Sequence, residues 1–465
     1  MPHLHAKLTF IPQKFNLLVI KVVQIFLPFI LRFRTRSWLR AGITKIEAIQ
    51  LENIVDLYQQ FQAGKIRFII AFHHPEVEDP LCLLYLFDRL LPQAAKEMGI
   101  QLNSPIHSHF IYDRGMTIWG GNWLGWLLSR SGGISIHRGR VFDRNALRFM
   151  RDLLVNGKFP FAIAPEGANN GHSEVISPLE PGVAQLGFWC MEDLKKAERT
   201  ETVWVIPIGI KYYYIQPPWL AIEKLLRQLE RDSGLSSGDF NAQTKPELQL
   251  YPRLLKLAEI LLSELEEFYQ RFYHQQLPEL EINQEVSSNI IIKKRLDRLL
   301  NIALKVAEEY FNISPQGTII DRCRRLEEAG WRYIYREDIE DINTLTPLQF
   351  GLGNWVAEEA KIRLKHMRLV ESFVAVTGTY IQEKPSAERF AETLLILFDL
   401  MARIKGIKVP RRPQLGQRGV KMTVGKPISI SDKWAVYQSS RHAAKQAVTD
   451  LTQEVETALI DLVKD

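Results

Sequence analysis

Short apolar runs alternate with helical patterns along the first half of the chain, and this alternation limits the folds open to it. The runs occur at residues 67–72, 106–112, 132–138, 159–164 and 203–210, and each has the length of a buried strand. Helical periodicity lies between them, as at residues 143–156. Strands that alternate with helices form a largely parallel sheet with helices on its faces. We therefore expect an α/β fold.

The first 45 residues differ from the rest of the chain in charge. They contain eight cationic residues and no Asp or Glu: Lys7, Lys14, Lys21, Arg32, Arg34, Arg36, Arg40 and Lys45. This segment carries +8, so the remaining chain carries −2 of the formal net charge of +6. Such a basic segment is suited to an anionic surface, either nucleic acid or bilayer headgroups.

An apolar run at residues 16–33 lies among these charges. Lys21, Gln24 and Pro28 interrupt it, so it is too short for a bilayer span, which needs about 20 apolar residues. No small-residue cleavage site follows, as a signal peptide would require. A nucleic-acid-binding arm explains the arginines but not the apolar run. We expect an in-plane or re-entrant helix at the cytoplasmic face of an anionic membrane, in a peripheral or monotopic protein.

The length of the chain, 465 residues, exceeds the size of a single typical core. The three cysteines, Cys82, Cys190 and Cys323, are far apart and indicate a reducing compartment. Periodicity predicts a helix at 46–62, long helices within 216–410, and the return of a strand at 420–428. These patterns give four parts: a membrane-associating segment (1–45), the first part of the α/β domain (46–215), a helical insertion (216–410), and a C-terminal strand and helix (411–465).

Residues 73–80 carry the side chains most suited to chemistry. The apolar strand ends at His73 and His74, and Asp79 stands before Pro80 and a new apolar run, as the N-cap of a helix would. An imidazole held by a carboxylate can take a proton from a hydroxyl. A metal site that adds Glu78 is the alternative, but no other His or Cys cluster completes a ligand set, so we expect no metal.

Three further segments contain residues that could bind a ligand. Arg138, at the end of a short strand, could bind a phosphate through two hydrogen bonds from its guanidinium group. Glu166 and Gly167 follow another buried strand and are expected at the same sheet edge as His74. The tryptophan-rich and glycine-rich stretch at 118–128 is expected to be a core helix, with the lining of an apolar channel as the alternative.

These loops resemble the motifs of the glycerolipid acyltransferase family, which includes lysophosphatidic acid acyltransferases. The first motif, His-x4-Asp, falls on His74 and Asp79. The second motif, Gly-x-x-Phe-Ile-x-Arg, falls on Gly132, Ser135, Ile136 and Arg138, with serine replacing phenylalanine. The third motif, Glu-Gly-Thr-Arg-Ser, is matched only by Glu166 and Gly167. The fourth, an apolar strand with an internal proline, falls on Val205–Gly209. Order and spacing agree over about 140 residues.

The resemblance implies a function. A fatty acyl group would move from acyl-CoA or acyl carrier protein to a hydroxyl of a glycerolipid or lysophospholipid at a membrane surface, with no cofactor and no nucleic-acid partner. His74 would be the general base, oriented by Asp79. Arg138 would bind acceptor phosphate, and Glu166 with Gly167 would shape the acceptor loop.

Two other functions remain open from the sequence. One is a lipid thioesterase or hydrolase that uses the same histidine. The other is a catalytically altered, lipid-binding or scaffolding protein. Asn169 stands where the third motif has arginine, and an amide cannot replace a bidentate guanidinium contact to phosphate. This departure favours a neutral glycerolipid or a larger lysolipid as the acceptor.

Overall fold

The computed structural model describes residues 4–137, 143–280, 287–407 and 410–464. The chain divides into two compact units. The sheet unit consists of residues 10–136, 142–216 and 416–465, and the helical unit of residues 1–9, 137–141 and 217–415.

The sheet unit is built on one large sheet. Among the described residues it has eight strands in the order β2–β9–β7–β3–β6–β4–β5, with β10 paired to β7. The strands are β2 (Ile43–Ile49), β3 (Ile66–Phe72), β4 (His109–Asp113), β5 (Gly133–Ile136), β6 (Phe161–Ile163), β7 (Thr202–Tyr214), β9 (Arg418–Val424) and β10 (Ile428–Ser429). The strands from β7 to β5 run parallel, and β9 and β10 are antiparallel to β7. The predicted α/β fold with a largely parallel sheet is confirmed.

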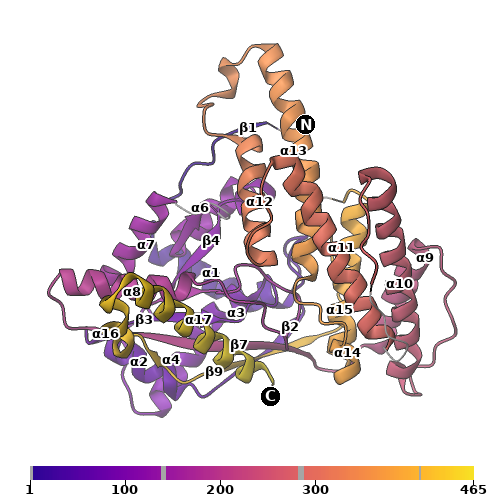
Figure 1. The fold of residues 1–465 in the computed structure, drawn as a ribbon. Helices are drawn as coiled ribbons and strands as arrows, with labels where there is room; N and C mark the ends of the chain where they lie inside the picture. Colours follow the sequence, from indigo (N-terminus) through magenta and orange to yellow (C-terminus); the bar gives the residue numbers. More distant parts are fainter. Residues whose placement is uncertain (1–3, 138–142, 281–286, 408–409, 465) are drawn as a thin grey trace. The chain divides into compact units, whose positions relative to one another are not determined.

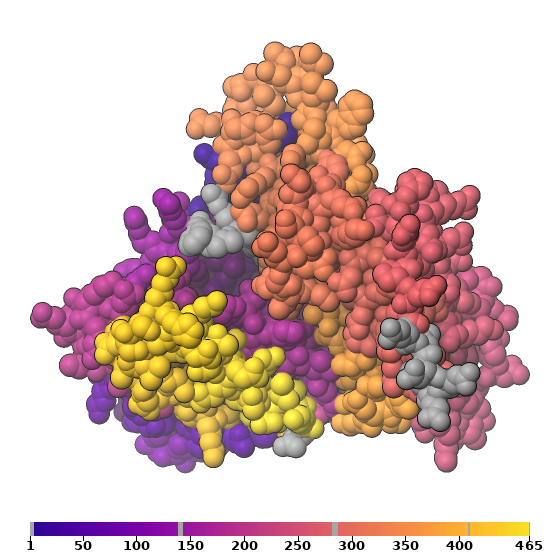
Figure 2. Space-filling view, viewed as in Figure 1, coloured from indigo at the N-terminus to yellow at the C-terminus, as the bar shows by residue number. Residues whose placement is uncertain are grey.

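Helices cover both faces of this sheet. One face packs against α1 (Leu17–Arg32), α2 (Glu52–Gln62), α3 (Asp79–Tyr85), the π-helical turn η1 (Leu86–Leu90) and α4 (Leu91–Glu97). The other packs against α7 (Arg144–Asn156), α8 (Gly182–Lys196) and α17 (Arg441–Lys464). In Figure 1, α17 lies in front of β7, with α16 (Trp434–Ser439) beside it. Figure 2 shows the surface of these C-terminal helices in yellow.

The predicted helix at 46–62 is wrong over its first part. Residues 43–49 form strand β2, which pairs in parallel with β9, and the helix α2 begins only at Glu52. Gln50, with a φ of 58°, makes the turn between them. The pairing with β9, which lies about 370 residues further along the chain, overrides the helical spacing that the local sequence shows.

The tryptophan-rich stretch at 118–128 is not a core helix. It is divided between two short helices, α5 (Met116–Gly120) and α6 (Asn122–Arg130). Trp119, Trp123 and Trp126 are exposed. Gly121, between the helices, has a φ of 85° and turns the chain, so the segment cannot continue as one helix.

The N-terminal segment is integrated into the fold. Asn16 caps α1, its Oδ1 accepting from the backbone N–H groups of Leu18 and Val19. Upstream, the Ile11 N–H donates to Ser135 Oγ at 2.9 Å. The inner face of α1 supplies three buried side chains to the core: Ile20, Leu27 and Leu31. In the described part of the chain, no helix is long and apolar enough to cross a bilayer.

The helical unit carries the middle of the chain. Its elements are α9 (Trp219–Asp232), α10 (Pro246–Tyr273), α11 (Ser288–Phe311), α12 (Ile319–Ile334), the 3₁₀ turn η2 (Ile342–Thr344), α13 (Pro347–Phe373), α14 (Tyr380–Glu383) and α15 (Ala387–Ile404). The short strands β1 (His5–Ala6) and β8 (Tyr335–Arg336) pair in parallel, so the N-terminus is part of this unit. Back in the sheet unit, η3 (Ser431–Lys433) leads from β10 to α16.

Candidate active site

Several strands place their polar ends at one edge of the main sheet. β3 and β6 end there, and β7 continues past them to Tyr214. β9 is antiparallel to β7 and therefore begins at the same edge, where Arg418 is paired with Tyr214. β2 also begins there, since Ile43 is paired with Arg418. In open α/β sheets, the carboxyl ends of parallel strands are where ligands bind.

His74 and Asp79 meet at this edge. The Nδ1–H of His74 donates to Asp79 Oδ2 at 2.9 Å. The Asp79 side chain is fully buried, whereas that of His74 is 20% exposed. Among the described residues, no hydrogen bond to His74 Nε2 is found. The structure thus brings the two predicted residues together and leaves Nε2 of the partly exposed histidine outside the fully buried atoms. Asp79 is the first residue of α3, and Glu78 occupies the cap position.

Three donors fix the Asp79 carboxylate. Oδ2 accepts from His74 and from the Glu76 N–H at 2.8 Å, and Oδ1 accepts from the Tyr212 hydroxyl at 2.5 Å. Burial raises the pKa of Asp79, and these donors oppose the rise. Burial, together with the Asp79 charge, raises the pKa of Tyr212 well above its ordinary value, so that its hydroxyl keeps its proton. The carboxylate therefore has one orientation, and it holds one tautomer of His74.

The neighbouring histidine, His73, is engaged at both ring nitrogens. Nδ1–H donates to Glu166 Oε1 at 2.8 Å, and Nε2–H donates to the His172 carbonyl at 3.0 Å. Burial alone would lower the pKa of His73, but the Glu166 carboxylate raises it above its ordinary value. An imidazole that donates from both nitrogens is the charged form. His73 and Glu166 therefore form a buried ion pair. Of the two neighbouring histidines, His74 is the one whose Nε2 could accept a proton.

Glu166 joins the loops after β3 and β6. Besides His73, its Oε1 accepts from the His74 backbone N–H at 2.9 Å. Its Oε2 accepts from Asn170 Nδ2 at 2.9 Å and from the Ser177 N–H at 2.8 Å. Burial opposes ionisation of Glu166, but these partners, the His73 charge foremost, lower its pKa. Because both oxygens are occupied, Glu166 shapes the loop that carries His74.

A second layer of buried charge lies beneath this loop. Arg40 and Arg418 both bind Glu76, Arg418 at 3.3 Å. Arg418 also donates to the Ala41 carbonyl at 2.8 Å, and the Ala41 N–H donates to Glu78 Oε1 at 2.6 Å. Burial raises the pKa of Glu78, and the Arg418 charge opposes this. Removing one partner from such a cluster leaves a buried charge uncompensated, at a cost of about 3–5 kcal/mol.

The remaining predicted residues differ in outcome. Arg138 lies outside the described residues. Gly167 follows Glu166 with a φ of 72°, a turn that glycine adopts without strain. Asn169 is exposed. Ser135, in the second motif, is fully buried, and its hydroxyl donates to the Ile11 carbonyl at 3.1 Å.

Sequence reasoning missed the residues that hold the pair in place: His73, Arg40, Glu76, Tyr212 and Arg418. One signal was available for Tyr212. The predicted strand stopped at residue 210, yet its alternation continues through Tyr212 and Tyr214 as far as the sheet edge. The arginines carry no local signal.

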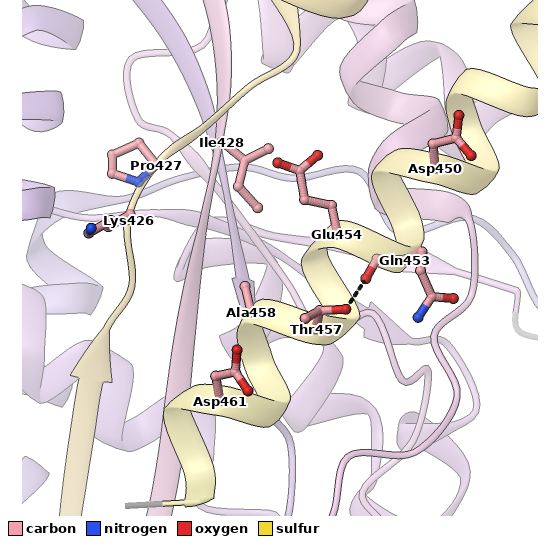
Figure 3. A pocket seen from close by; sticks show the side chains of 9 residues that line it. All are labelled: Lys426, Pro427, Ile428, Asp450, Gln453, Glu454, Thr457, Ala458 and Asp461. Atoms are coloured by element: carbon pink, nitrogen blue, oxygen red, sulfur yellow. Dashed lines mark hydrogen bonds between the residues drawn. The ribbon is translucent and has the colours of Figure 1, made fainter.

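Two further features of the described residues bear on where a ligand could bind. Within the described ranges, no group of three or more His, Cys, Asp or Glu side chains could hold a metal ion. A groove of about 640 Å³ lies between α17 and the β9–β10 connection, lined by Lys426, Asp450, Glu454 and Asp461 among others (Figure 3). Neither His74 nor Asp79 lines it.

The sequence matches no protein-family model and no curated protein.

Proposed function

We propose that the protein transfers a fatty acyl group from a thioester, acyl-CoA or acyl carrier protein, to a hydroxyl of a glycerolipid or lysophospholipid. One observation carries the proposal: a buried carboxylate fixes Nδ1 of a partly exposed histidine at the carboxyl edge of a parallel sheet. The order of the loops, which resembles the glycerolipid acyltransferase motifs, supports the same chemistry.

In the proposed reaction, His74 Nε2 takes the proton of the acceptor hydroxyl. The hydroxyl oxygen forms a bond to the thioester carbonyl carbon, and the carbon–sulfur bond then breaks. The thiolate leaves with the proton returned by His74, so the products are an ester and a free thiol. Asp79 stabilises the imidazolium that forms between these steps.

The test is turnover of a labelled acyl thioester with a panel of acceptors. We expect His74→Ala to lower the rate by roughly 10²–10⁴-fold, which is the usual contribution of a general base. Asp79→Asn should also impair transfer severely. His442→Ala, which alters an exposed histidine on α17, serves as the control and should keep full activity.

The products distinguish the other two functions. Free fatty acid in place of a new ester would identify a hydrolase. No turnover with any donor and acceptor, in a protein that still binds lipid, would identify a scaffold. Near wild-type transfer by His74→Ala would refute the mechanism. The panel should include lysophosphatidic acid beside a neutral glycerolipid, because Asn169 favours an acceptor other than a simple glycerol phosphate.

The proposed place of this reaction is the cytoplasmic face of a membrane, with the protein attached peripherally or monotopically. The charge of residues 1–45 supports attachment to an anionic surface. Helix α1 supports it too, since its outer face is apolar and exposed. This helix packs against α3, which begins with Asp79, so a lipid surface on α1 would be close to the site.

A further inference from the structure

The outer face of α1 is a continuous apolar row without a protein partner among the described residues. Its exposed side chains recur at helical spacing: Leu18, Val22, Ile25, Phe26, Phe29 and, just after the helix, Phe33. Leu18 and Ile25 are 74% and 71% exposed. A row of this kind is far more apolar than a soluble surface helix requires, and large exposed apolar patches mark binding surfaces.

A second exposed apolar group comes from a different part of the sequence, α5 and α6. Ile118, Trp119, Trp123 and Trp126 are all exposed there, Trp126 by 53%. Tryptophan at a surface is costly to expose, and its amphipathic ring is suited to the boundary between lipid and water. This group lies outside the basic N-terminal segment and was not expected at the surface.

The two groups are joined by side-chain contacts. The segment after α1 brings Trp38 to Trp119, with their ring centroids 5.4 Å apart, and places the Arg36 guanidinium 4.8 Å from the centre of the Trp123 ring. Helix α1 also packs against α6. We call these residues together the aromatic surface: the exposed row of α1, Arg36, and the exposed side chains of α5 and α6.

The charges around the aromatic surface indicate which kind of partner it fits. The two stretches that build it lie within residues 4–46 and 114–137, and the sequence has no Asp or Glu in these ranges. Lys21, Arg32 and Arg36 are exposed on or beside α1, and Arg130 lies over the Trp126 ring at 5.6 Å. Apolar and indole side chains with cations among them match acyl chains below anionic headgroups.

We infer that the aromatic surface binds a bilayer that contains anionic lipids, and that the tryptophans of α5 and α6 are an essential part of it alongside α1. The inference deepens the proposed function, since it names the surface from which a lipid acceptor would arrive. Its test needs no turnover.

The experiment is co-sedimentation of the full chain with vesicles of phosphatidylglycerol and phosphatidylcholine, beside vesicles of phosphatidylcholine alone. We expect tighter binding to the anionic vesicles, and binding about tenfold weaker in Trp123→Ala/Trp126→Ala. Trp355→Ala removes a tryptophan on α13 that is 63% exposed and is the matched control, with unchanged binding expected. Arg32→Gln/Arg36→Gln should weaken binding to anionic vesicles by roughly fivefold per arginine, and less at high salt.

Three results would overturn the inference. One is wild-type binding by the tryptophan pair variant. The second is equal affinity for neutral and anionic vesicles. The third is self-association that the tryptophan pair variant abolishes while vesicle binding stays unchanged, because the surface would then bind a second copy. A protein that binds vesicles through these residues yet transfers no acyl group would establish the surface and refute the proposed function.

Discussion

At the residue scale, the orientation of Asp79 depends on one hydroxyl from a distant strand. Tyr212 is the partner of Oδ1, while His74 and Glu76 share Oδ2. Arg418 lies over the Tyr212 ring at 5.0 Å, so the tyrosine is itself held in place. Tyr212 therefore acts as a positioning residue, through Asp79, on a histidine it does not touch.

We predict that Tyr212→Phe lowers kcat by roughly tenfold and leaves KM unchanged. A hydrogen bond to a charged group contributes about 1.5–3 kcal/mol, and phenylalanine removes only the hydroxyl. Steady-state kinetics with a saturating thioester measures the change. Tyr213→Phe is the control, because that hydroxyl points to the other face and binds Glu47 at 2.7 Å. Equal effects of the two variants would contradict a positioning role.

Two buried histidines in the sheet unit set a pH limit on stability. Burial lowers the pKa of His107 and His109 to about 4. In the unfolded chain a histidine has a pKa of about 6.5, so between these values the unfolded state takes up protons that the folded state refuses. Stability is thus present above pH ~6.5 and is lost as the pH falls towards 4.

We predict a loss of about 2 kcal/mol per histidine between pH 7 and pH 5. Unfolding by urea at the two pH values, followed for the sheet unit, measures it. His109→Gln should show a smaller difference between the two pH values, whereas His442→Gln, at an exposed position, should match the wild type. An identical pH dependence in all three proteins would show that burial does not restrict protonation of these rings.

At the element scale, the local sequence was enough for the strands that carry the site. Apolar runs at residues 67–72, 159–164 and 203–210 predicted β3, β6 and β7, because a fully buried strand needs a continuous apolar stretch. The same reasoning placed His74 and Glu166 at one edge. It failed at β2, where pairing with a distant strand determines the structure.

The two supporting arginines could not be predicted for the same reason. Arg40 and Arg418 are separated by most of the chain, yet both bind Glu76. No spacing rule links residues that meet only because β2 and β9 pair in parallel. The exposure of the tryptophans in α5 and α6 could not be predicted either, since a tryptophan-rich sequence has the same pattern whether the rings face a core or a surface.

The element α1 shows why a whole segment should not be deleted to test membrane binding. Its inner residues belong to the core of the sheet unit, and Arg40, just beyond it, belongs to the buried charge cluster. Removing residues 1–45 would therefore unfold the protein, and a loss of lipid binding in that variant could not be assigned to the outer face of α1. Substitutions on the outer face separate these two effects.

At the scale of the whole molecule, the helical unit is inserted between two strands that pair with each other. β7 precedes the insertion in the chain and β9 follows it. Next to the insertion, Tyr214 is paired with Arg418, and the Ile215 N–H donates to the Gln417 carbonyl at 3.0 Å. The two ends of the insertion are thus already those of a β-hairpin. Closing them needs only a short turn of about two to five residues.

We predict that the sheet unit folds when residues 217–415 are replaced by such a turn. Residues 1–9 must be removed as well, because the Leu4 N–H donates to Asn354 at 2.9 Å and its side chain is buried in the helical unit. Circular dichroism and thermal unfolding should show a cooperative transition, since the two buried apolar clusters on the faces of the sheet consist of residues of the sheet unit. The full chain without residues 1–9 is the control for that deletion. A shortened protein without a cooperative transition, beside a control that folds, would show that the sheet unit depends on the insertion for its stability.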